Sequence, residues 1–348
     1  MRPHPLVIAE SIAQWGEPFV ELAIFGTADA AAIAAQVDSF CREHLGAGVA
    51  GALFEYASIG NVHGLVLEDG RRVVLKAHQP TMELAHLRAV QRCVRHLSDA
   101  GFPAPRPLVE VAPLARGHAW VEEMLDRGTW EDPHRPDVRR AMAEGLAEVV
   151  RLCERVADVE GLRCEPLGSV PEGRLWPVPH SKLFDFEKTA KGAENIDALA
   201  RAAREVLARG DRGPRVVGHH DLRAEHVRFE RRGGVPVLVA TYDWDSLMLS
   251  HETSLLGVNA HAFAADWSTD PPRVRPAPSL DEARAYVAEY EQARGHRFTN
   301  EQRLCVGASF AYAVAYTARC GHALGGPVEE GSFGALARRG EALLRGWS

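Results

Sequence analysis

The stretch from residue 216 to residue 246 constrains the fold of this chain most. It opens with an apolar run that leads into His219-His220-Asp221. A glycine turn and a second apolar run, 235–241, then lead to Asp243. The pattern predicts a loop after one strand, a β-hairpin, and a second aspartate where the hairpin ends. This arrangement is typical of phosphoryl-transfer sites, where one carboxylate orients the attacking hydroxyl and another binds a metal ion.

The composition is that of an ordinary globular protein with one large domain or two lobes. Of its 348 residues, 46% are hydrophobic and 25% are charged. The net charge of -7 argues against a general nucleic-acid binder, which is usually basic. The same charge would suit a cationic substrate, although solubility alone also explains it.

The cysteines and the apolar runs indicate the cellular compartment of the protein. The six cysteines form no C-x-x-C pair, so a zinc knuckle is not expected. Several fall in helical patterns as small core residues, which indicates a reduced, cytoplasmic protein. No apolar stretch is long enough to span a bilayer, and we expect neither a signal peptide nor a membrane partner.

The N-terminal part predicts one helix and a three-stranded meander. The helix covers 28–45, and the strands cover 52–56, 62–67 and 72–77. Lys76 lies inside the third strand. It is either an outward-facing lysine on an edge strand or a lysine that reaches nucleotide phosphates. The aspartate pair far downstream favours the second interpretation, because independent parts then agree.

Two neighbouring segments supply further candidates for nucleotide binding. The turn before the second strand carries Ser58, Gly60 and Asn61, although it lacks the G-x-G-x-x-G pattern. The helix expected over 81–99 begins near Glu83, the candidate carboxylate partner for the lysine. Alternatively, Glu83 is a solvated glutamate, and Gln91 in the same helix is the neutral partner of Lys76.

A lobe boundary is expected after two more strands, near 108–112 and 118–122. Strands dominate before this point and helices after it, so the lobes are predicted as 1–124 and 125–348, a two-lobed α+β fold. Glu123 and Leu125 lie at the crossover and are candidates to offer backbone groups to a purine. The alternative is a plain strand-to-helix loop. Further helices are expected over 136–157, 194–209, 252–265, 280–294, 299–322 and 333–346, with an irregular segment over 158–192.

The core stretch resembles the aminoglycoside phosphotransferase family, which shares the protein-kinase-like fold with choline kinases. That family's pattern is roughly H-G-D-L-H-x-x-N, a hairpin, then I-D-W. The resemblance covers residues 50–322 and implies ATP or GTP as phosphate donor, Mg²⁺ (or Mn²⁺), and a small-molecule hydroxyl acceptor. Asp221 would orient that hydroxyl, His219 would brace the loop, and Asp243 would bind the metal ion.

Three residues depart from the family pattern. His220 replaces a glycine, and Arg223 replaces a histidine with a fixed positive charge that could hold the transferring phosphate or pair with an acid. His226 replaces the asparagine that binds the metal, and imidazole is a poor ligand for Mg²⁺. Either His226 ligates a softer ion such as Mn²⁺, or Glu225 or Asp245 supplies the missing oxygen, or catalysis is lost.

Three functions therefore remain open from the sequence. The first is a kinase of an antibiotic or other natural product, of aminoglycoside or nucleoside type, in resistance or self-protection, with choline, homoserine or a sugar as alternative acceptors. The second is a nucleotide-binding pseudokinase. The third is a hydrolase with a metal bound by His219, His220, Asp221 and His226. It leaves Lys76, the meander and Asp243 without roles. A monomer or a homodimer is expected.

Overall fold

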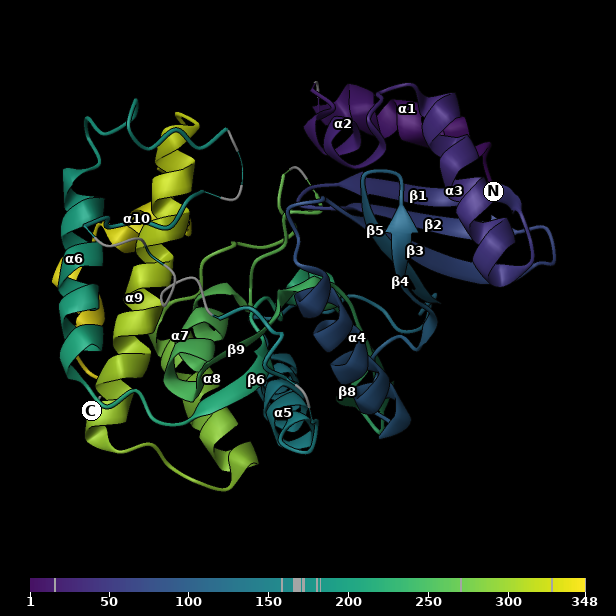
Figure 1. Cartoon of the computed structure of the whole chain (residues 1–348). Helices are drawn as coiled ribbons and strands as arrows, with labels where there is room; N and C mark the ends of the chain where they lie inside the picture. The colour runs from purple at the N-terminus through teal and green to yellow at the C-terminus, as the bar shows by residue number, and fades with distance from the viewer. Residues whose placement is uncertain are drawn as a thin grey trace. The chain divides into compact units, whose positions relative to one another are not determined.

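The computed structural model describes residues 1–15, 17–157, 159–164, 170, 173–179, 181, 183–269, 271–326 and 328–347. The chain forms two compact units. The first comprises Met1–Asp126 with Glu160–Leu162, and the second comprises Arg127–Val159 with Arg163–Ser348. The first unit combines a five-stranded sheet with helices, and the second is mainly helical, which confirms the α+β class (Figure 1). The division falls two residues after the boundary at 124 that the sequence predicts.

A five-stranded antiparallel sheet forms the first unit, in the order β1-β2-β3-β5-β4. The predicted meander is its first half, and tight turns join its strands because they contain glycines, one of which, Gly70, has a φ of 86°. The strands are β1 (Val49–Ala57), β2 (Asn61–Leu67), β3 (Arg72–His78), β4 (Pro107–Leu114) and β5 (Gly117–Glu123).

Helices cover this sheet. Three precede it, and Figure 1 shows them along one side of the sheet: α1 (His4–Trp15), α2 (Phe19–Phe25) and α3 (Ala30–Leu45). Their apolar residues form one buried cluster with the strands, to which Leu75 and Ala77 belong. Since side chains alternate along a strand, Lys76 points to the opposite face. Helix α4 (Leu84–Asp99) packs against β4.

The second unit is built on long helices. Its core is one apolar cluster, to which Leu146, Ala203, Leu255, Tyr286 and Phe310 contribute. Capping boxes start the helices at Ser279 and Thr299, as the sequence pattern requires. The helices are α5 (Pro136–Cys153), α6 (Glu194–Arg209), α7 (Glu252–Ala262), α8 (Leu280–Arg294), α9 (Asn300–Ala323) and α10 (Phe333–Ala337), and the short 3₁₀ helix η4 (Gly340–Leu344) follows them.

Two short antiparallel pairs of strands carry the core stretch. Strand β6 (Arg215–His219) pairs with β9 (Leu247–His251), and β7 (Val227–Arg232) pairs with β8 (Val235–Thr241). The 3₁₀ turns η2 (Ala224–His226) and η3 (Trp244–Ser246) connect them. The hairpin and the loop before it agree with the prediction. The β6–β9 pair does not appear in the prediction, because no local pattern indicates that these separated segments meet.

No single helix among the described residues is long and apolar enough to cross a membrane. The bent pair α2 and α3 passes the same test by length and composition only. Five of the six cysteines are buried and Cys164 is exposed, and all six are free thiols.

Candidate active site

His219 connects the two aspartates of the core stretch through the backbone. Its buried ring lies at the end of β6, where Nδ1 accepts the backbone N–H of Asp221 at 3.1 Å. The other ring nitrogen, Nε2, donates to the carbonyl oxygen of Tyr242 at 2.9 Å, one residue before Asp243. The two bonds fix the tautomer of His219. One side chain therefore holds the loop that carries Asp221 and the strand end that carries Asp243.

Asn259 is a second residue that positions the loop, and the sequence did not reveal it. It lies buried on α7, and its Nδ2 donates to the carbonyl of His219 at 2.9 Å. Its Oδ1 accepts the backbone N–H of Leu222 at 3.2 Å. The amide thus holds the backbone on both sides of Asp221. The sequence signal was weak, because Asn259 is one of several polar residues in this helix.

The backbone at Asp243 is strained. Its φ of 60° and ψ of 45° lie in the left-handed region, which residues other than glycine rarely adopt. Trp244 stabilises this turn: its buried indole donates to the carbonyl of Thr241 at 3.0 Å, and its ring centroid lies 5.0 Å from that of His219. Such strain persists where the surroundings hold it in place, commonly at functional sites.

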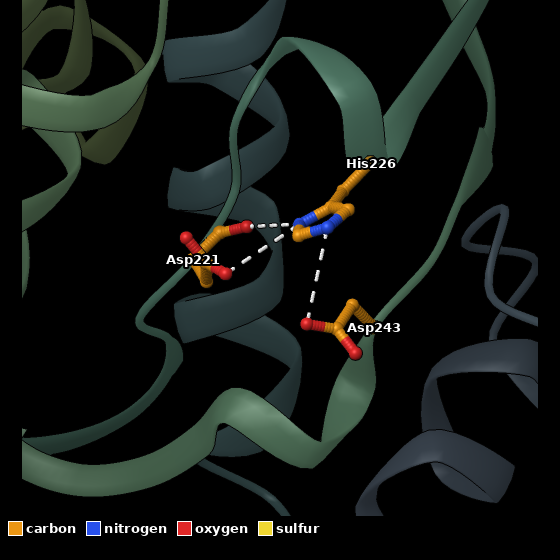
Figure 2. Close-up of side chains that lie close together, drawn as sticks. All are labelled: Asp221, His226 and Asp243. Carbon is orange, nitrogen blue, oxygen red and sulfur yellow. Dashed lines mark hydrogen bonds and ion pairs between the residues drawn. The ribbon is translucent and has the colours of Figure 1, made fainter. Parts of the chain in front are cut away.

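Asp221, His226 and Asp243 converge in space, as Figure 2 shows. His226 comes from η2, and its Nδ1 lies 2.8 Å from the backbone carbonyl of Asp221 and 3.7 Å from that residue's Oδ2. Its Nε2 lies 3.9 Å from Oδ2 of Asp243. One potential ligand atom from each of the three residues lies within 4.8 Å of the others. These groups can hold a divalent cation.

Arg223 pairs with the acids of the loop. Its Nη1 donates to Oδ1 of Asp221 at 2.6 Å, and its Nε donates to Glu225. The guanidinium also lies 4.5 Å from the ring centroid of Trp267, whose backbone N–H donates to Glu225 at 2.7 Å. Arg223 is therefore held from three sides with part of its charge directed at Asp221.

The electrostatics of this cluster follow from burial and from the mixture of charges. Burial raises the pKa of Asp221, and the positive charges of Arg223 and His226 oppose that effect. Burial also acts to raise the pKa of Glu225, but its hydrogen bond with His226 and the charge of Arg223 lower it to about 2. Burial and Arg223 act to lower the pKa of His226, yet the surrounding carboxylates raise it. The cluster is built around charged groups.

The first unit carries the other group of predicted residues. Lys76 is buried, with 3% of its surface exposed, and its Nζ lies 5.7 Å from the ring centroid of Trp120 on the neighbouring strand. Gly60 lies against the same strand, because a Cβ there would meet the carbonyl oxygen of Ala77 at 2.8 Å. Only glycine fits this close approach between backbones. Lys76 is therefore not an outward-facing lysine in solvent, which was one of its two interpretations.

The sequence profile of the family described as APH, phosphotransferase enzyme family, matches residues 64–296, more than half of the chain. The chain belongs to this phosphotransferase family. The matched region contains Lys76, Asp221 and Asp243. No curated protein matches the sequence.

Solved structures of such enzymes share the fold at low identity. The amicoumacin kinase hAmiN, in complex with AMP-PNP, Ca²⁺ and Ami, has a TM-score of 0.59 at 13% identity, with 84% of this chain and 87% of that chain covered. Macrolide 2'-phosphotransferase type I has a TM-score of 0.52 at 17% identity, with 91% of this chain and 97% of that chain covered. A choline/ethanolamine kinase family protein from Mesorhizobium loti has a TM-score of 0.54 at 17% identity, with 90% of this chain and 95% of that chain covered. The protein-kinase-like fold is thereby confirmed.

His220, one departure of this phosphotransferase from the family pattern, is a buried residue with hydrogen-bond partners. The ring is buried, and its Nε2 lies 2.7 Å from Oγ of Ser250 on β9. Its backbone N–H donates to the carbonyl of Ser246 at 2.9 Å. Burial lowers the pKa of His220 to about 3, so the ring is neutral. The added bulk therefore packs into the β6–β9 pair.

The remaining predicted residues of the phosphotransferase lie in different surroundings. Asn61 is buried at the start of β2 and donates to Glu55. Glu83 is exposed at the position before α4. Gln91 bonds the backbone of β4, with its Nε2 donating to the Val109 carbonyl at 2.8 Å. Ser58 directly follows β1, Glu123 ends β5, and Leu125 lies two residues beyond it. The backbone N–H of Glu123 donates to the carbonyl of Arg106 at 2.9 Å.

Proposed function

We propose that this phosphotransferase moves the γ-phosphate of ATP or GTP to a hydroxyl group of an antibiotic or related natural product. The observation that carries the proposal is the pair of bonds from His219, which hold Asp221 and the Asp243 turn together. Phosphoryl transfer depends on positioning and electrostatics more than on covalent chemistry. A rigid frame around two carboxylates meets that requirement.

Asp221 accepts the proton of the acceptor hydroxyl in this mechanism. The hydroxyl oxygen forms a bond to the γ-phosphorus, the bond from that phosphorus to the bridging oxygen breaks, and the nucleoside diphosphate leaves. Arg223, 2.6 Å from Asp221, stabilises negative charge on the transferring group. Lys76 binds the nucleotide phosphates, a role for which its burial within a strand is suited.

A divalent metal ion fits the donor atoms of His226 and Asp243, beside the carboxylate of Asp221. Carboxylates and a neutral imidazole are common ligands, and the three donor atoms lie within 4.8 Å of one another. The ion supplies charge neutralisation of the phosphates when it is bound. His219 and the turn at Asp243 keep the carboxylate of Asp243 near the other two groups.

The names of structurally similar proteins support an antibiotic as the acceptor. Two of the three solved structures above are named as kinases or phosphotransferases of antibiotics, amicoumacin and macrolide. The net charge of -7 suits an acceptor that carries amino groups. Choline or ethanolamine, named for the third structure, forms the alternative acceptor class.

The test is transfer of labelled phosphate. The purified chain is incubated with [γ-³²P]ATP or [γ-³²P]GTP, Mg²⁺ or Mn²⁺, and a panel of hydroxylated antibiotics, choline, homoserine and sugars. We expect label in an antibiotic acceptor. Label found only in choline, homoserine or a sugar would show that the acceptor is a primary metabolite.

A nucleotide-binding pseudokinase is the second candidate. The ion pair of Arg223 with Asp221 and the imidazole at position 226 favour it, because both alter groups that a kinase uses. Thermal-shift titration with AMP-PNP and metal, run beside the label experiment, separates the two functions. Nucleotide binding without transfer to any acceptor assigns the pseudokinase.

A further inference from the structure

The ring of His226 is oriented with one nitrogen available for a metal ion. A backbone carbonyl can only accept, so Nδ1 carries the proton that it donates to the carbonyl of Asp221 at 2.8 Å. When the ring is neutral, as metal binding requires, its lone pair lies on Nε2. Histidines that bind metals commonly donate their other ring N–H to a backbone carbonyl in this way, because that bond fixes the tautomer and the ring plane.

Acidic oxygens surround this same nitrogen. Nε2 of His226 lies 3.3 Å from Oε1 of Glu225 and 3.9 Å from Oδ2 of Asp243. A lone pair and two carboxylates repel one another unless a cation lies between them. Arg223 supplies part of that positive charge, and a metal ion or a proton on Nε2 would supply the rest. Arg223, whose Nη2 lies 3.5 Å from Nε2, borders the group and is held by its own bonds to Asp221 and Glu225.

We propose that His226 Nε2 is a direct ligand of the catalytic metal ion and that the ion is Mn²⁺ in preference to Mg²⁺. This rests on the proposed function, since nucleotide phosphates would complete the coordination. Mg²⁺ prefers oxygen ligands and octahedral geometry, whereas Mn²⁺ accepts carboxylates and an imidazole nitrogen in the same geometry. The carboxylates argue against a soft, thiolate-selecting site.

The test uses the paramagnetism of Mn²⁺. The full chain is loaded with Mn²⁺ and AMP-PNP, and electron spin echo envelope modulation records nitrogen coupled to the metal ion. We expect a signal from a coordinated imidazole nitrogen, which shifts to that of ¹⁵N when the protein is grown with ¹⁵N-histidine. Calorimetry should give a Kd for Mn²⁺ that is at least about tenfold below the Kd for Mg²⁺ in the presence of AMP-PNP.

His226→Asn is the decisive variant because asparagine restores the oxygen ligand of the family pattern. We expect the nitrogen signal to vanish and the preference for Mn²⁺ to narrow toward equal affinity. His44→Asn, the same change at a partly exposed histidine on α3, is the matched control and should leave both readouts unchanged. Circular dichroism of each variant checks that the chain is folded.

The outcomes separate this proposal from the proposed function. Mn²⁺ and AMP-PNP bound without any coupled histidine nitrogen would overturn the ligand role of His226, and the phosphotransferase would stand with a protonated imidazole there. Equal Kd values for the two ions would overturn the preference for Mn²⁺. Failure of the folded chain to bind AMP-PNP with either ion would instead contradict the proposed function.

Discussion

Two buried clusters of histidines and carboxylates in this molecule differ in the direction of their pKa shifts. In the second unit, the catalytic-loop cluster consists of Asp221, Arg223, Glu225, His226 and Asp243. In the first unit, the N-terminal cluster lies between α1, α2 and the sheet and consists of His4, Ser11, Glu21, Glu55, Asn61 and His63.

The same residue types titrate differently in the two clusters. The pKa of Glu225 is lowered to about 2, whereas burial raises the pKa of Glu55 to about 7. The pKa of His226 is raised, whereas burial lowers the pKa of His4 to about 4. The difference lies in the partners: Glu225 has Arg223, while Glu55 accepts from the neutral side chains of Asn61 and Ser11. Burial alone favours the neutral form of a carboxyl group, whereas burial beside a fixed cation keeps the carboxylate charged.

The largest effect is expected when the metal carboxylate is removed from the catalytic-loop cluster. Asp243→Asn keeps the shape of the side chain but removes its charge, so phosphate transfer should fall by about 10³-fold or more, because charge stabilisation of the phosphates is lost. Initial rates of label transfer measure this. Asp281→Asn, at an exposed aspartate on α8, is the matched control. A variant at position 243 with unaltered transfer and unaltered affinity for metal would show that the strained turn has another purpose.

A smaller effect should follow from loss of the residue that holds the loop. Asn259→Ala removes the bonds to His219 and Leu222, and we expect kcat to fall by about 10- to 100-fold because Asp221 is then less well oriented. Ser309→Ala removes another buried polar side chain, on α9, and is the control for general loss of stability. Steady-state kinetics and thermal unfolding of both variants measure the two effects. Equal losses of kcat would mean that Asn259 acts only on stability.

The N-terminal cluster should respond in stability and not in transfer. The pKa of Glu55 is higher in the folded protein than in the unfolded chain, so its contribution to stability is complete at low pH and is lost as pH rises toward and through about 7. Glu55→Gln should therefore raise the free energy of unfolding at pH 8, by roughly 1–3 kcal/mol, and change it little at pH 4.

Urea unfolding at the two pH values measures this difference. Glu43→Gln, at an exposed glutamate on α3, serves as the control and should show no such dependence. A Glu55 variant that is destabilised equally at both pH values would show that Glu55 carries its charge in the folded protein. The contrast between the two clusters would then fail.

The sequence predicted most of the helices and the local parts of the site. Residues 194–209 and 280–294 are helices in the structure as the periodicity indicated, and the hairpin with its two aspartates is present. Such features depend on neighbours in the sequence. The role of Asn259 and the pairing of β6 with β9 depend on segments tens of residues apart, for which one sequence carries little signal. The partner of His220, Ser250, is hidden for the same reason.

The chemistry of Asp221 is the central claim, and one variant tests it most directly. Asp221→Asn should bind AMP-PNP with a Kd close to that of the native chain, because Lys76 and the metal ligands His226 and Asp243 remain. Its transfer of label from [γ-³²P]ATP or [γ-³²P]GTP to the antibiotic panel should fall by about 10²- to 10⁴-fold, the range expected for loss of a positioned base. A variant that binds AMP-PNP and transfers label at the native rate would contradict the account.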